Sequence, residues 1–117
     1  MAATLCGSPM YMAPEVITSQ KYRENADLWS IGVIVFQALT TRAPFPANNP
    51  HQLRNFYMNN VHIKADLPRN ITTTLKNLLH GLLEKDPNKR LSMQKFFEHN
   101  FVKSFHDRKM AELERAR

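Results

Sequence analysis

Apolar residues dominate one stretch of the chain, residues 27–39, which reads Asp-Leu-Trp-Ser-Ile-Gly-Val-Ile-Val-Phe-Gln-Ala-Leu. A helix with this pattern is apolar nearly all the way round, and such helices are normally buried inside a protein. The run from Val33 to Val35 also fits a buried strand, but strands usually have about 4–8 residues, so the length favours a helix. A membrane span needs roughly 20 apolar residues, and Asp27 and Gln37 also argue against one. We therefore predict a buried central helix that the other segments surround.

The segment before this helix is rich in residues that are typical of turns. Residues 1–12 contain Gly, Ser and Pro without a helical period, which predicts a loop. Pro14 suits the first position of a short helix that continues to Ser19, because its missing N–H costs nothing there. A polar connector follows, in which Glu24 or Asn25 is the candidate cap of the central helix.

Further helices follow the central one, which we expect to end near Thr41. Two prolines within residues 42–46 exclude regular hydrogen bonding there. Asn49 and Pro50 are typical of a helix start. Helical spacing predicts an amphipathic helix with Leu53, Phe56 and Tyr57. It predicts a second one over residues 72–83, whose apolar stripe consists of Leu75, Leu78, Leu79, Leu82 and Leu83. A short helix with Met93, Phe96 and Phe97 follows, with Ser92 as its cap. The predicted fold class is all-α, because no pair of strands is evident.

Composition fits one small domain. The chain has 117 residues, of which 43% are hydrophobic, enough to fill a core. Cys6 is its single cysteine, which excludes an internal disulfide and suggests a reducing compartment, so we expect a cytoplasmic protein. No charged segment followed by an apolar one opens the chain, so we expect no signal peptide. From Lys103 onward the chain is strongly charged and forms either an exit helix or a frayed end.

The net charge of +6 suggests an acidic partner, nucleic acid or a solvated basic surface. We favour the solvated surface, because the lysines and arginines are spread along the chain without aromatic residues between them. Binding to nucleic acid or to a membrane would show a steep salt dependence. We therefore expect no nucleic-acid partner and no integral membrane segment.

No complete catalytic site is evident from the residues alone. The three glycines, at 7, 32 and 81, are too far apart for a phosphate-binding loop. There is no Cys-x-x-Cys, no His-Glu-x-x-His and no histidine pair one helical turn apart, so no metal site is predicted. Glu15 and Arg90 lie beside large apolar segments. They are either ordinary surface charges or a buried bidentate pair.

Several motifs nevertheless resemble those of one enzyme family. Residues 4–15 read Thr-Leu-Cys-Gly-Ser-Pro-Met-Tyr-Met-Ala-Pro-Glu and resemble the end of a protein-kinase activation segment. Residues 27–32 resemble the start of the central helix in the kinase large lobe, and Ala-Pro-Phe at 43–45 the loop after it. Asp-Pro-Asn-Lys-Arg at 86–90 resembles a late kinase motif. His-Asn-Phe at 99–101 resembles the closing His-Pro-Phe, with Asn100 in place of proline. The chain is similar to the large lobe of serine/threonine protein kinases, and within them to the autophagy-initiating kinases.

The resemblance implies that the chain consists of a partial domain and a tail, and it implies a role for several residues. Residues 1–102 are expected to form part of a protein kinase domain, and residues 103–117 a charged C-terminal tail. The expected roles are an activating phosphorylation site at Thr4; substrate binding at Gly7, Ser8, Pro9, Met10 and Tyr11; a buried ion pair between Glu15 and Arg90; and scaffold residues Asp27 and Trp29. Ser8 matches the hydroxyl residue that supports the catalytic loop, and Asp27 matches the residue that anchors the backbone of that loop.

Other kinase motifs are missing from the sequence. The Gly-rich loop, the lysine-bearing strand, His-Arg-Asp and Asp-Phe-Gly supply ATP contacts, the catalytic base and the magnesium ligands, and none of them is present. We therefore expect no catalytic residue, cofactor or metal in this chain alone. ATP and magnesium belong to the full-length parent, from which the chain looks cut.

Two functions follow as hypotheses. The first is a fragment of a serine/threonine kinase that supplies the substrate-facing loop and the helical scaffold, with protein substrates, autophagy regulators and the rest of the kinase domain as partners. The second is a truncated, non-catalytic interaction module that competes for substrates or regulators through Leu53, Tyr57 and the loop at 59–70. In either case the absence of the other kinase segments would expose apolar faces of the central helix. We therefore expect the isolated chain to be marginally stable.

Overall fold

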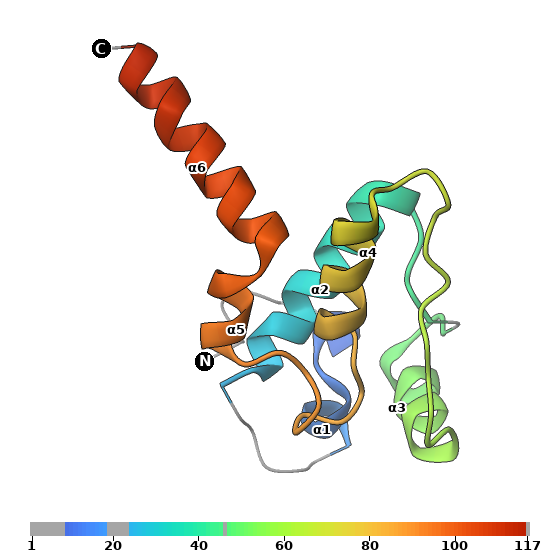
Figure 1. Ribbon diagram of the computed structural model, residues 1–117. Coiled ribbons are helices and arrows are strands. Elements are labelled where there is room, and N and C mark those ends of the chain that lie inside the picture. Colours follow the sequence, from blue (N-terminus) through green and yellow to red (C-terminus); the bar gives the residue numbers. More distant parts are fainter. Residues whose placement is uncertain (1–8, 19–23, 46, 117) are drawn as a thin grey trace.

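The computed structural model of the chain describes residues 9–18, 24–45 and 47–116. Within these ranges the chain forms six α-helices and one short 3-10 turn, without a β-strand (Figure 1). The all-α fold class is therefore confirmed. In chain order the elements are η1 (Pro9–Tyr11), α1 (Pro14–Ile17), α2 (Ala26–Thr40), α3 (Pro50–Asn59), α4 (Thr73–Leu82), α5 (Met93–Glu98) and α6 (Asn100–Arg115).

Helix α2 is the centre of the fold, as its pattern predicted. Its first three turns bury Leu28, Trp29, Ser30, Val33 and Phe36. Two hydrophobic clusters meet on this helix. One gathers around Trp29 and includes residues of α3 and of the segment before α1. The other gathers around Leu28 and includes leucines of α4 and partly buried side chains of α5 and α6.

Gly32 lets α2 and α4 approach closely. A Cβ atom added at this position would lie 2.9 Å from Leu82 Cβ and 2.9 Å from Leu83 Cδ2. Contacts this short would force the two helices apart, because protein cores are close-packed. Gly32 therefore serves helix packing, in agreement with its exclusion from a phosphate-binding loop.

The exposed end of α2 corrects one prediction. Ile34 and Leu39 each retain 40% of their accessible surface, and Ala38 is exposed as well. The helix is therefore not buried all round. These apolar residues face outward in part, although the sequence pattern is that of a fully buried helix.

Side-chain caps begin α3, α4 and α5, and the caps Asn49 and Ser92 were predicted. The side chains of Asn49, Thr72 and Ser92 accept hydrogen bonds from the backbone N–H groups of Gln52, Leu75 and Lys95. Each bond satisfies a donor that has no partner within the helix. Asn25 occupies the cap position of α2 but makes no side-chain cap bond. The cap role predicted for its side chain is therefore wrong.

Helix α6 extends away from the other helices toward the C-terminus (Figure 1). Only its start is anchored, where Phe101 and Val102 pack against the cluster around Leu28. Beyond this point Phe105, Met110 and Leu113 are exposed. The charged segment from Lys103 is thus a helical continuation of the preceding residues. Across the described part of the chain, no helix combines the length and apolar character that crossing a membrane requires.

Candidate functional site

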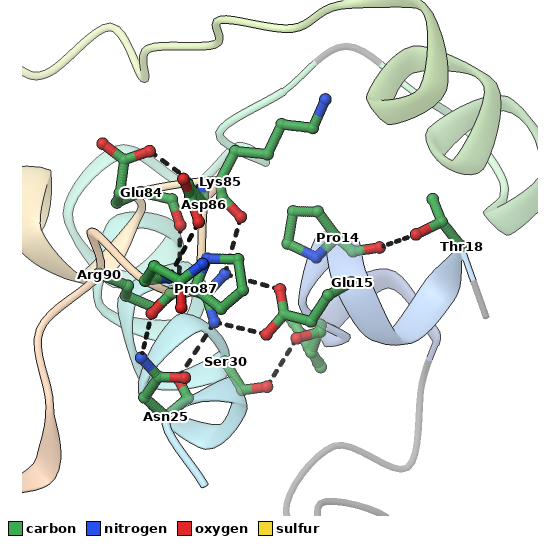
Figure 2. Close-up of polar contacts among 12 residues, drawn as sticks. Pro14, Glu15, Thr18, Asn25, Ser30, Glu84, Lys85, Asp86, Pro87 and Arg90 are labelled. Carbon is green, nitrogen blue, oxygen red and sulfur yellow. Dashed lines mark hydrogen bonds and ion pairs between the residues drawn. The ribbon is translucent and has the colours of Figure 1, made fainter. Parts of the chain in front are cut away.

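A buried ion pair joins two segments that lie 75 residues apart in the sequence. Arg90 is 4% exposed and Glu15, in α1, is 3% exposed. Two nitrogens of the Arg90 guanidinium each donate to one Glu15 carboxylate oxygen, both over 2.7 Å. Figure 2 shows the two side chains facing each other in this bidentate arrangement. Of the two possibilities that the residues alone left open, the structure shows the buried pair.

The backbone around Arg90 satisfies the rest of its guanidinium. Nε donates to the carbonyl of Glu84 over 2.8 Å, and the two terminal nitrogens also donate to the carbonyls of Asn25 (3.2 Å) and Lys85 (3.1 Å). With the two bonds to Glu15, all five N–H donors of the arginine have an acceptor. Arg90 therefore binds α1, the start of α2 and the loop after α4 to one another.

Local turn chemistry presents Arg90 to this site. The Asp86 carboxylate accepts from the backbone N–H of Asn88, and the Asp86 carbonyl accepts from Lys89 and Arg90. These bonds form a tight turn, which suits Asp followed by Pro. Lys85 Nζ donates to the carbonyls of Tyr57 and Asn60, which ties the loop to the end of α3. The Asp-Pro-x-x-Arg motif thus acts as a folded unit.

Asn25 and Trp29 extend the site toward the core. Asn25 Nδ2 donates to the carbonyl of Pro87 over 2.7 Å, so the start of α2 holds the same turn (Figure 2). The Arg90 guanidinium lies 5.3 Å from the centre of the Trp29 ring, within the range of a cation–π contact. Trp29 is fully buried, stacks on Phe45 and meets Tyr57 edge-on. Its position in the core is the one that we predicted.

The Tyr57 phenol lies near the ion pair and is buried. Burial raises the pKa of the Tyr57 phenol above its ordinary value, with Arg90 opposing this shift and Glu15 adding to it. A phenol in this setting stays protonated, because desolvation disfavours the charged form.

A second pair of contacts fixes the segment before α1 on α2. Ser30 Oγ donates to the carbonyl of Tyr11 over 2.7 Å, and the Tyr11 hydroxyl donates to Gln37 Oε1 over 2.9 Å. Residues Pro9–Tyr11 form the turn η1, which also contacts α3. Ser30 and Gln37 were not predicted from the sequence to hold this segment. The available signal was their polar character within an otherwise apolar helix.

Several residues with predicted roles lie outside the described part of the chain. These are Thr4, Gly7 and Ser8; of Pro9, only the backbone is described. Met10 and Tyr11 are half-buried and pack against the cluster around Trp29. Asp27 lies in the first turn of α2 and is partly exposed. Its role as an anchor for a catalytic loop stays a prediction.

A cavity lies beside Glu15. Its volume is about 490 Å³, and its lining includes Thr18, Met58, Val61 and Lys89. Leu53 and Tyr57, the contact residues of the interaction-module hypothesis, are only 3% and 2% exposed. That assignment is wrong, because the helical spacing of Leu53 and Tyr57 directs them into the core. Met58, at 58% exposed, and Val61, at 77%, are the apolar residues that face solvent here.

Comparisons with known proteins agree with the motifs. The protein kinase domain family matches residues 1–102. Over 102 residues the chain is 53% identical to human Serine/threonine-protein kinase ULK1, covering 87% of the chain and 10% of that protein. It is 50% identical to Serine/threonine-protein kinase unc-51 of Caenorhabditis elegans, covering 89% of the chain and 12% of that protein. With Serine/threonine-protein kinase ATG1b of Arabidopsis thaliana the identity is 45%, over 87% of the chain and 14% of that protein.

The chain therefore spans between a tenth and a seventh of the length of these relatives. The resemblance to the autophagy-initiating kinases rests on the activation-segment end and on the start of α2, and the relatives above are serine/threonine-protein kinases. With a family match over 102 of its 117 residues, the chain belongs to the protein kinase domain family.

Proposed function

We propose that this chain supplies the substrate-facing segment and the helical scaffold of the large lobe of a serine/threonine kinase. The observation that carries this proposal is the fastening of residues 9–15 to α2 and to the loop after α4. Ser30 and Gln37 of α2 hold Tyr11, and Arg90 of that loop holds Glu15. A segment held at both places is positioned before a substrate arrives, which lowers the cost of ordering it on binding.

The parent enzyme would transfer the γ-phosphate of ATP to serine or threonine of a protein, with magnesium. Its missing parts would supply the ATP site, the catalytic base and the metal ligands, so this chain alone is not catalytic. Phosphorylation of Thr4 would add about −1.5 to −2 charge, which requires an arginine partner from those parts. The exposed apolar residues of α2, Ile34 and Leu39, would be covered by the rest of the kinase domain. The proposed cellular setting is the cytoplasm, in autophagy.

Within this proposal Ser8 supports the catalytic loop through its hydroxyl. A suitable test places residues 1–102 of this chain in human ULK1, in exchange for the segment that they match. We expect this chimera to phosphorylate a serine-containing peptide. Ser8→Ala should lower kcat strongly, by about 10²-fold or more if the hydroxyl orients the catalytic groups, and should leave ATP binding unchanged.

The matched control is Ser92→Ala in the same chimera. Ser92 also loses a hydroxyl, but its side chain caps α5 and shows no hydrogen bond to the described residues 9–15. We expect this control to lower stability by about 1 kcal/mol and to leave kcat unchanged. Turnover of the Ser8→Ala chimera at the level of the unsubstituted chimera would exclude the role of Ser8.

A non-catalytic interaction module is the second candidate. The observation in its favour is the pair of exposed apolar residues Met58 and Val61, which line the cavity beside Glu15. The same chimera separates the two candidates. A chimera that folds and binds ATP but phosphorylates no peptide would leave the interaction module as the remaining function.

A further inference from the structure

His99 links the start of helix α6 to helix α4 through its two ring nitrogens. Nδ1 lies 3.2 Å from the backbone nitrogen of Phe101, and Nε2 lies 2.9 Å from Asn77 Oδ1. His99 is the N-cap residue of α6, so its bond to Phe101 satisfies a backbone N–H that has no acceptor within the helix. Phe101 also anchors α6 on the cluster around Leu28. One imidazole therefore joins the start of α6 to α4.

These two bonds require one protonation state of the ring. A backbone N–H can only donate, so Nδ1 of His99 must carry a free lone pair and no proton. The single proton of the neutral ring then lies on Nε2, from which it is donated to Asn77 Oδ1. Only the neutral imidazole, in this one tautomer, makes both bonds.

Protonation of His99 removes one of the two bonds. An imidazolium donates from both nitrogens, so the ring keeps its bond to Asn77 and loses the bond from the N–H of Phe101. Its positive charge would also lie at the N-terminus of a helix, where the helix dipole disfavours a cation. No acidic residue lies in the first turn of α6 to replace the cap. A proton on His99 thus releases α6 while the ring stays bound to α4.

The surroundings of the ring combine access to solvent with opposed charges. His99 is half-buried and lines a cavity of about 560 Å³. The charged residues of this lining, Lys95 and Glu98, both belong to α5 and have opposite signs. The lining residues of α4, among them Asn77, carry no charge. In α6 the nearest charged residue along the chain is Lys103, which is exposed. The two hydrogen bonds of the ring are therefore its main specific interactions in the described structure.

We propose that His99 is a pH-sensitive switch that holds the first turn of α6 when neutral and releases it when protonated. Histidine is the side chain that ordinarily changes its charge between about pH 5 and 8. The cap is therefore present at the upper end of this range and is lost toward the lower end. Every described residue of α6 after Val102 is exposed. The direction in which α6 leaves the other helices thus depends on its first turn, which the switch controls.

The test follows the 117-residue chain by NMR at pH values from 8 to 5. At pH 8 we expect the ring of His99 to carry its proton on Nε2. As the pH falls, the protection of the Phe101 amide against hydrogen exchange, corrected for the intrinsic pH dependence of exchange, should drop about fivefold, as for the loss of a cap. Amides in the middle of α2 should keep their protection, because the release is confined to the start of α6.

His99→Asn separates the cap from the titration. Asparagine is a common cap and does not titrate, so the Phe101 amide should keep its protection at pH 5 in this variant. The matched control is His106→Asn, the same replacement at an exposed position of α6. This control should retain the pH dependence of the unsubstituted chain.

Equal protection of the Phe101 amide at pH 8 and pH 5 in the unsubstituted chain would overturn the proposal. So would a proton on Nδ1 of the neutral ring, or a loss of protection that persists in His99→Asn and therefore belongs to another group. Loss of protection in α2 and α6 together would show general unfolding in acid, and would overturn the proposal as well.

Discussion

Replacing Arg90 by Met should lower the free energy of unfolding by about 3–5 kcal/mol, the usual loss when one partner of a buried ion pair is removed. The Glu15 carboxylate would stay buried, at 3% exposure, without its counter-charge. Three backbone carbonyls, of Asn25, Glu84 and Lys85, would lose their donor as well. A urea titration followed by circular dichroism measures the loss. A variant without a cooperative transition would show that the loss exceeds the stability of the chain.

The partner variant Glu15→Gln should cost less, about 1–3 kcal/mol, since the amide oxygen still accepts one bond from Arg90. Replacing both residues by apolar ones often restores stability in other proteins. Here the double variant Glu15→Leu with Arg90→Met should not return to the stability of the unsubstituted chain, because the carbonyls of Glu84 and Lys85 lose the donors that Arg90 supplies. Lys89→Met, an exposed neighbour, is the control and should change stability by no more than about 0.5 kcal/mol. A loss below 1 kcal/mol for Arg90→Met would contradict this account of the site.

Replacing Trp29 by Ala should cost about 3–5 kcal/mol, as expected for a large aromatic residue in a core. The side chain is fully buried and contacts the rings of Phe45 and Tyr57 and the guanidinium of Arg90. Its removal would leave a cavity between these two rings and the guanidinium. Thermal and urea unfolding measure the effect. Leu113→Ala, at a position 59% exposed on α6, is the control and should change stability by at most about 0.5 kcal/mol.

Trp29→Phe separates packing from polar effects. The indole Nε1 is buried, and among the described residues it has no hydrogen-bond acceptor. Phe keeps most of the apolar contact and removes this donor, whose burial is costly. We therefore expect a loss of only about 1 kcal/mol. If Phe and Ala at this position cost the same, ring packing would not be the main contribution of Trp29.

Local sequence signals were sufficient where local chemistry decides the structure. Asn49, Thr72 and Ser92 cap their helices because a short polar side chain reaches the backbone N–H three residues later. Pro44 lies in the segment after α2, where the missing N–H of proline excludes a regular helix. The central helix also follows from its apolar pattern, and its observed limits, Ala26–Thr40, lie close to those expected.

These local signals could not predict the contacts between distant segments. Asparagine is a common capping residue, but the side-chain amide of Asn25 donates instead to the carbonyl of Pro87, 62 residues away. His99, whose ring nitrogen accepts from the N–H of Phe101, caps α6 although histidine is not a typical cap. The residues alone left Glu15 and Arg90 as either surface charges or a pair. The kinase resemblance, and not the residue pattern, predicted that they would meet.

The same limit applies to exposure. The sequence pattern of α2 is that of a helix buried all round, and Ile34 and Leu39 belong to that pattern. Their 40% exposure depends on which other segments pack against the helix. A pattern on one helix cannot specify this, because burial is a property of the whole assembly of segments.

The central claim is that the scaffold holds the substrate-facing segment firmly in place. The most direct measurement is amide hydrogen exchange of Val16, Ile17 and Thr18 in the unsubstituted chain, whose N–H groups bond to the carbonyls of residues 13 and 14. If Arg90 fastens α1 as described, these amides exchange only when the whole chain unfolds, at the rate of the amides in the middle of α2. Exchange of α1 many times faster than that of α2 would show a segment that opens on its own, and would contradict the account.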